Sequence, residues 1–118
     1  MVANHQVWQR AEALERLGGD EDLLRELCQI FLEESPKLLL TLRQAALAGD
    51  AEAVMRAAHS FKGELSYLGA EEATHAARVL ENMGHEKDLS GADATLVSLE
   101  RQVTELCLSM KSARGSRQ

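Results

Sequence analysis

Aromatic residues, proline and cysteine are scarce in this chain of 118 residues, which has 3% aromatic residues, one proline and two cysteines. Cys28 and Cys107 lie far apart, and neither has a second thiol close by, so a disulfide framework or a zinc site has little support. We expect both to be small buried side chains in a reducing compartment. His75 and His85 are ten positions apart and lack the i, i+4 spacing of a helical metal site, so we expect no metal.

Long apolar runs and an excess of positive charge are also absent. No run approaches the roughly 18 apolar residues of a membrane-spanning helix, and the first ten residues lack the apolar centre of a signal peptide. We therefore expect a cytoplasmic protein without a membrane partner. Nineteen acidic and thirteen basic residues give a net charge of −6, which opposes nonspecific binding to nucleic acid. No glycine-rich nucleotide loop is present, so we expect no bound ATP and no cofactor.

Alanine, leucine, glutamate and arginine, which favour helices, dominate what is present. Apolar residues recur at helical spacing in five segments, over about 4–17, 20–48, 51–68, 71–84 and from about 92 onward, with a polar loop at 85–91. We predict one all-α domain over residues 1–118. Its parts are an antiparallel four-helix bundle over about 20–111, an additional short N-terminal helix over about 4–17 packed on one end, and a frayed tail over 112–118.

Helix boundaries are marked by residues that cap or interrupt helices. Asp20 and Asp50 are expected to cap the helices that follow them. Gly69 and Gly84 are expected to end the third and fourth of the five segments. Pro36 removes one backbone hydrogen bond, at a cost of about 3 kcal/mol if nothing compensates, so we expect it to bend or break the second segment.

His59 lies in the third segment, within the sequence AHSFKGEL. At 100° per residue, with His59 placed at 0°, the apolar side chains gather between about 160° and 240°. These residues are Val54, Ala57, Phe61, Leu65 and Leu68. The imidazole is therefore predicted to face solvent rather than to be a hydrogen-bonded core group.

The neighbours of His59 distinguish it from an ordinary surface histidine. Lys62, three positions on, places a cation within reach of anything attached to the ring. Gly63, four positions on, has no side chain, and this absence would let a second protein come close. A glycine inside a helix costs about 1 kcal/mol of helix stability relative to alanine. On the same side, we assign four residues to partner docking: Met55, Arg56, Ser66 and Tyr67.

This combination suits nucleophilic attack by a neutral imidazole nitrogen on an activated phosphoryl group. Lys62 would then steady the phosphoryl oxygens. Because Glu52 and Glu64 provide neither a phosphate cradle nor a complete metal site, the phosphoryl donor and any Mg²⁺ are expected to come from a partner protein.

The sequence His59-Ser60-Phe61-Lys62-Gly63, with Gly69 ten positions after the histidine and Leu80-Glu81 in the next segment, resembles the histidine-containing phosphotransfer (HPt) domain. The resemblance covers about residues 10–85. It implies a four-helix bundle that carries phosphate between receiver-domain aspartates in multistep two-component relays. The domain would have no kinase activity of its own and no cofactor. His59 would be the phosphoacceptor, Lys62 the residue near the phosphate, and Gly63 the glycine that admits the receiver.

The partners implied are response-regulator receiver domains and a hybrid sensor histidine kinase, and we expect the carrier to be a monomer. Phe61 departs from the usual leucine of the family and should need only repacking. Glu64 replaces a small residue and could reach Lys62 or a neighbouring helix, and Tyr67 is bulkier than usual, so both could alter partner choice. An alternative function is a scaffold or sequestering module that binds a receiver or kinase while His59 stays unphosphorylated.

Overall fold

The computed structural model describes residues 7–115, and this part of the chain is helical without any strand. Five helices follow one another: α1 (Arg10–Arg16), α2 (Glu21–Leu47), α3 (Ala51–Tyr67), α4 (Glu71–Glu86) and α5 (Ala92–Gly115). The all-α class is therefore confirmed. None of the described helices is long and apolar enough to cross a membrane.

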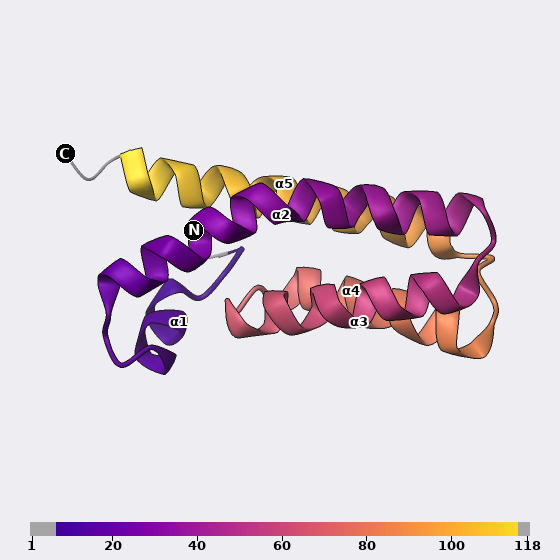
Figure 1. The fold of residues 1–118 in the computed structure, drawn as a ribbon, viewed down its shortest axis with the longest axis horizontal. Coiled ribbons are helices and arrows are strands. Elements are labelled where there is room, and N and C mark those ends of the chain that lie inside the picture. Colours follow the sequence, from indigo (N-terminus) through magenta and orange to yellow (C-terminus); the bar gives the residue numbers. More distant parts are fainter. Residues whose placement is uncertain (1–6, 116–118) are drawn as a thin grey trace, which may run out of the picture.

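The four longer helices run in alternating directions and form an antiparallel bundle (Figure 1). In that view α2 and α5 lie together along the upper side and α3 and α4 along the lower side, while the short α1 lies at the end where α3 turns into α4. The backbone N–H of Gln9 donates to the carbonyl of Leu68, 3.3 Å away, which ties the start of α1 to this turn. The predicted bundle with a short additional N-terminal helix is confirmed.

The core is built from one face of each helix. On α3 the buried residues are Val54, Ala58, Phe61 and Leu65, which recur at the spacing expected of one helical face. The Phe61 ring packs on the Phe31 ring of α2, with centroids 6.1 Å apart. Phe61 therefore fills the α2–α3 interface with an aromatic pair instead of a single aliphatic side chain.

Both predicted aspartate caps are present. Asp20 accepts a hydrogen bond from the Leu23 N–H at 3.0 Å, and Asp50 accepts one from the Ala53 N–H at 3.1 Å. Gly69 follows α3 with φ +73°, and a Cβ there would lie 2.6 Å from the Gln9 Cβ. The turn between α3 and α4 therefore requires glycine for both its backbone conformation and its space.

Pro36 does not break its helix. Helix α2 is continuous from Glu21 to Leu47 with Pro36 inside it, and Figure 1 shows α2 changing direction along its length. Residues before and after the proline are buried in the bundle, including Phe31, Ser35 and Leu42. This packing holds the helix on both sides of the one backbone hydrogen bond that proline cannot make.

The predicted start of the N-terminal helix was wrong. Helix α1 begins at Arg10, and the described residues before it, 7–9, are not helical. Trp8 is buried there, and its indole N–H donates to Ser109 Oγ of α5 at 3.3 Å. Tertiary contacts therefore hold residues 7–9 in a non-helical conformation. The remainder of the predicted helix, 4–6, lies outside the described residues.

The predicted end of the fourth segment was also wrong. Helix α4 continues past Gly84 to Glu86 and ends at Lys87, whose φ of 59° is left-handed. Gly84 is buried inside the helix, where a Cβ would lie 2.6 Å from the Ala51 carbonyl oxygen and 2.7 Å from the Met55 nitrogen. Gly84 thus permits α3 and α4 to approach closely and does not end the helix.

The last helix reaches into the segment predicted to be a frayed tail. Helix α5 extends to Gly115, so residues 112–115 of the predicted tail over 112–118 are helical. Residues 116–118 lie outside the described range. The last helical residues continue the regular backbone of α5 beyond Met110, the final buried residue of its apolar stripe.

Candidate functional site

His59 lies on the face of α3 opposite the core. Its side chain is 68% exposed, whereas Ala58 and Phe61 on the other side of the same helix are fully buried. The predicted direction of the imidazole, away from the bundle interior, is therefore confirmed. Any group attached to this ring would stand on the surface of the protein.

Glu81 of α4 joins His59 to Lys62 through its two carboxylate oxygens. Its Oε2 lies 2.6 Å from His59 Nδ1, and its Oε1 lies 2.7 Å from Lys62 Nζ. The side chains of Glu81 and Lys62 are 19% and 26% exposed, so both are more buried than the imidazole. One carboxylate of α4 therefore contacts both predicted site residues of α3, His59 and Lys62.

The pKa of Glu81 is lowered, chiefly by the hydrogen bond from Lys62 and secondarily by the hydrogen bond from His59, against an opposing effect of desolvation. An ionised carboxylate only accepts hydrogen bonds, so His59 Nδ1 carries the proton in this contact. The neutral ring then has its lone pair on Nε2. Glu81 thereby favours the tautomer in which Nε2 is unprotonated.

Glu81 entered the sequence analysis only through the resemblance, and its contact with His59 was missed. A signal was nevertheless present, because His59 precedes Gly69 by ten positions and Glu81 follows it by twelve. An antiparallel helical hairpin turning at Gly69 brings such positions to a similar level. Spacing along one helix does not show this contact, because it joins two helices.

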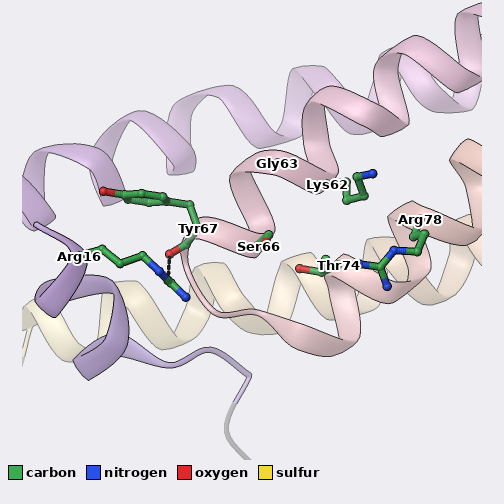
Figure 2. Close-up of a pocket in the computed structure, with 7 residues that line it drawn as sticks. All are labelled: Arg16, Lys62, Gly63, Ser66, Tyr67, Thr74 and Arg78. Carbon is green, nitrogen blue, oxygen red and sulfur yellow. Dashed lines mark hydrogen bonds between the residues drawn. The ribbon is translucent and has the colours of Figure 1, made fainter.

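Four of the predicted site residues border one shallow pocket of about 330 Å³, which is shown in Figure 2. We call it the Arg78 pocket and define it by its lining residues: Arg16 of α1; Lys62, Gly63, Ser66 and Tyr67 of α3; and Thr74 and Arg78 of α4. A Cβ on Gly63 would meet nothing within 4 Å. The open space expected at this glycine is therefore present.

The other two predicted docking residues, Met55 and Arg56, lie before His59 on α3 and do not line the Arg78 pocket. Met55 is half-buried, and its backbone faces Gly84. Arg56 is exposed and forms an ion pair with Glu52 at 2.8 Å. The structure thus separates the predicted docking residues into two groups, one on each side of His59.

Glu64 does not pair with Lys62, whose ammonium binds Glu81. It lines a separate apolar groove with Leu27 of α2 and with Tyr67. Desolvation there raises the pKa of Glu64, and the negative charge of Glu34 adds to the effect. Of the two predicted directions for Glu64, toward Lys62 or toward a neighbouring helix, the structure favours the second.

Neither cysteine forms a disulfide, and both are half-buried rather than fully buried as expected. The thiol of Cys107 lies 3.6 Å from the buried Ser35 hydroxyl. Within residues 7–115 no three or more histidine, cysteine, aspartate or glutamate side chains are placed to hold a metal ion together. His5 lies outside the described part of the chain.

Comparison with known proteins gives consistent results. The family model of the Hpt domain matches residues 26–113. The fold is similar to the crystal structure of histidine-containing phosphotransfer protein B (HptB) from Pseudomonas aeruginosa PAO1, with a TM-score of 0.88 and 27% identity over 98% of this chain and all of that one. It also resembles the HPT domain of a sensor hybrid histidine kinase from Shewanella, with a TM-score of 0.80 and 14% identity over 91% of this chain and 92% of that one. No curated protein matches the sequence.

Proposed function

Because this chain belongs to the Hpt domain family, whose model matches residues 26–113, we propose that it is a phosphorelay carrier acting through His59. The phosphoryl group comes from an aspartate of one receiver domain and passes to an aspartate of another. The observation that carries this proposal is the geometry at Glu81, which binds Nδ1 of an exposed histidine and the ammonium of Lys62 with one carboxylate.

Transfer is a displacement at phosphorus. The Nε2 lone pair of His59 forms the new P–N bond while the P–O bond to the receiver aspartate breaks, and its electron pair returns to that carboxylate. The Nδ1 proton stays in its hydrogen bond with Glu81, which balances the positive charge that develops on the ring. Lys62 offers its positive charge to the phosphoryl oxygens. Reversal of these steps delivers the group to the next receiver.

The partners proposed are response-regulator receiver domains, including that of a hybrid sensor histidine kinase. We place the Mg²⁺ that neutralises charge during transfer on the receiver. The carrier itself has neither kinase activity nor a cofactor in this proposal, and it works as a monomer in the cytoplasm. The similarity to HptB over nearly the whole chain supports the carrier function.

The proposal is tested by incubating the protein with a phosphorylated receiver domain and measuring its intact mass. We expect one added phosphoryl group, labile in acid and stable in base, and mapped by peptide mass spectrometry to His59. An acid-stable label, or a label on the exposed Ser60 or Ser66, would contradict the assignment. Receiver binding without any label would favour the scaffold alternative.

Lys62→Ala is predicted to slow transfer about tenfold, because a cation that stabilises phosphoryl oxygens is lost. The far-UV circular dichroism should stay unchanged, since the side chain lies outside the core. Lys37→Ala is the matched control, because Lys37 also pairs with a glutamate, Glu34, but lies on α2. A large loss of helix content in Lys62→Ala, or equal slowing in the control, would argue against the role of Lys62.

Glu81→Ala is predicted to slow transfer about tenfold, and Glu81→Gln less, since the amide oxygen still accepts a hydrogen bond from Nδ1. Glu81 positions the nucleophile without touching the phosphoryl group, so a readout beyond rate is needed. The ¹⁵N shifts of the His59 ring should show Nδ1 protonated in the wild type and a tautomer mixture in Glu81→Ala. An unchanged tautomer would remove the positioning role.

The lowered pKa of Glu81 also predicts an acid dependence of stability. A carboxyl whose pKa is lower when folded stabilises the fold fully above its unfolded pKa, about 4.3, and loses this contribution as the pH falls through the folded pKa. The difference in free energy of unfolding between wild type and Glu81→Gln should therefore shrink below about pH 4.3. Urea denaturation between neutral and acidic pH measures it.

A further inference from the structure

The Arg78 pocket adjoins the phosphoacceptor and is built by three helices. Lys62 and Gly63 belong both to the pocket and to the surroundings of His59. Figure 2 shows Lys62 and Arg78 toward one end, Arg16 toward the other and Ser66 between them. Any protein whose active site reaches His59 across the open position of Gly63 therefore covers this depression as well.

The pocket is cationic in a chain whose net charge is −6. Three of its seven lining residues carry a positive charge, Arg16, Lys62 and Arg78, and none of the seven is acidic. Three acidic side chains lie beside it without lining it: Glu81 binds Lys62, and Glu12 and Glu71 line an adjoining depression that also includes Arg16 and Arg78. The charge pattern favours an anionic occupant.

The three cations differ in whether they already form hydrogen bonds or ion pairs within the protein. Lys62 is paired with Glu81, and Arg16 donates to the Tyr67 carbonyl, with Glu12 3.9 Å from its guanidinium. Arg78 is exposed, and no hydrogen bond or ion pair links it to any residue in the described part of the chain. Its planar guanidinium is the group best able to form a two-pronged contact with a carboxylate.

The pocket is open to solvent, and this favours an anion carried by a docking protein over a small free anion. A small free anion would be little buried in a shallow depression of about 330 Å³ and would be weakly held. A carboxylate on the surface of a docking protein needs no strong binding of its own, because the rest of the interface holds it in place. Ser66 offers a further hydroxyl donor, whereas the Thr74 hydroxyl already donates to the Ala70 carbonyl.

We propose that the Arg78 pocket receives an acidic side chain from the surface of the docking receiver domain, with Arg78 as its main partner, and that this contact selects among receivers. The inference rests on the proposed carrier function and deepens it. A charge at the edge of an interface acts mainly on the rate of encounter and on partner choice, and it acts less at high salt.

The test compares Arg78→Glu with wild type and with Arg101→Glu, an equal charge reversal on α5. Each protein is labelled by the phosphorylated receiver that reacts fastest with wild type in a panel, and separately by phosphoramidate, a small reagent that phosphorylates histidine without docking. We expect Arg78→Glu to slow receiver transfer at least about tenfold at low salt and less at high salt, with Arg101→Glu nearly unchanged. All three should react equally with phosphoramidate.

Equal receiver transfer in Arg78→Glu and wild type would overturn the proposal. So would equal slowing with the receiver and with phosphoramidate, because Arg78 would then act on the histidine or its phosphoryl group. If wild type is labelled at His59 by neither donor, the carrier function itself fails, which is a separate result. Replacing surface acids of the receiver by lysine one at a time should restore transfer to Arg78→Glu at one position, and failure of every replacement would contradict the ion pair.

Discussion

Substitution of His59 by glutamine is expected to abolish the acid-labile label that a phosphorylated receiver transfers. The glutamine amide nitrogen has no available lone pair, so no P–N bond can form. The side chain is 68% exposed, so the free energy of unfolding should change by no more than about 0.5 kcal/mol. Loss of labelling in a folded variant would thus report on chemistry alone. Autoradiography or intact mass, with circular dichroism alongside, measures both.

His75→Gln is the matched control, because His75 is an exposed histidine on α4 that takes no part in the contacts around Glu81. It should be labelled at the wild-type rate. Labelling of His59→Gln at the wild-type rate would disprove the assignment of the phosphoacceptor. Loss of labelling in both variants would show that histidine substitutions disturb the protein generally.

Gly84→Ala is expected to destabilise the bundle by about 2–3 kcal/mol. The added Cβ would lie 2.6 Å from the Ala51 carbonyl oxygen and 2.7 Å from the Met55 nitrogen. These are backbone atoms, which cannot move aside as a flexible side chain can, so α3 and α4 must separate. Because that separation also moves Glu81 away from His59, transfer should slow along with the loss of stability.

Gly63→Ala provides a control for this prediction, since both glycines lie inside helices and receive the same side chain. A Cβ on Gly63 meets nothing within 4 Å, so the alanine should stabilise its helix by about 0.5–1 kcal/mol. Urea denaturation should therefore give changes of opposite sign for the two variants. Similar changes in both would mean that the close approach at Gly84 does not limit stability.

These two glycines show what the sequence could and could not predict. Helix period and caps located the bundle, because apolar spacing and Asp20 or Asp50 act within one helix. Gly84 was taken for a helix end because a glycine required by a neighbouring helix is indistinguishable, in the sequence, from one that stops a helix. The start of α1 was missed for a similar reason, since Trp8 is held by a contact with distant Ser109.

In the candidate site, too, features that depend on one helix were predicted and features that depend on two helices were not. The exposure of His59 and its nearness to Lys62 and Gly63 follow from positions on one helix, and both were predicted. The carboxylate of Glu81 and the guanidinium of Arg78 come from α4, and their places depend on how α3 and α4 are paired. Contacts between two different helices therefore supplied what the periodicity of a single helix could not.

Helix α3 has one face that is fully buried and one that carries His59. A phosphoryl group on Nε2 would add atoms and charge only outside the bundle. It would therefore not contact the buried side chains of Val54, Phe61 and Leu65. The phosphorylated and unphosphorylated forms should then share one shape. A receiver would then have to recognise the phosphoryl group itself at the surface. The carrier would transfer this group without undergoing a conformational switch.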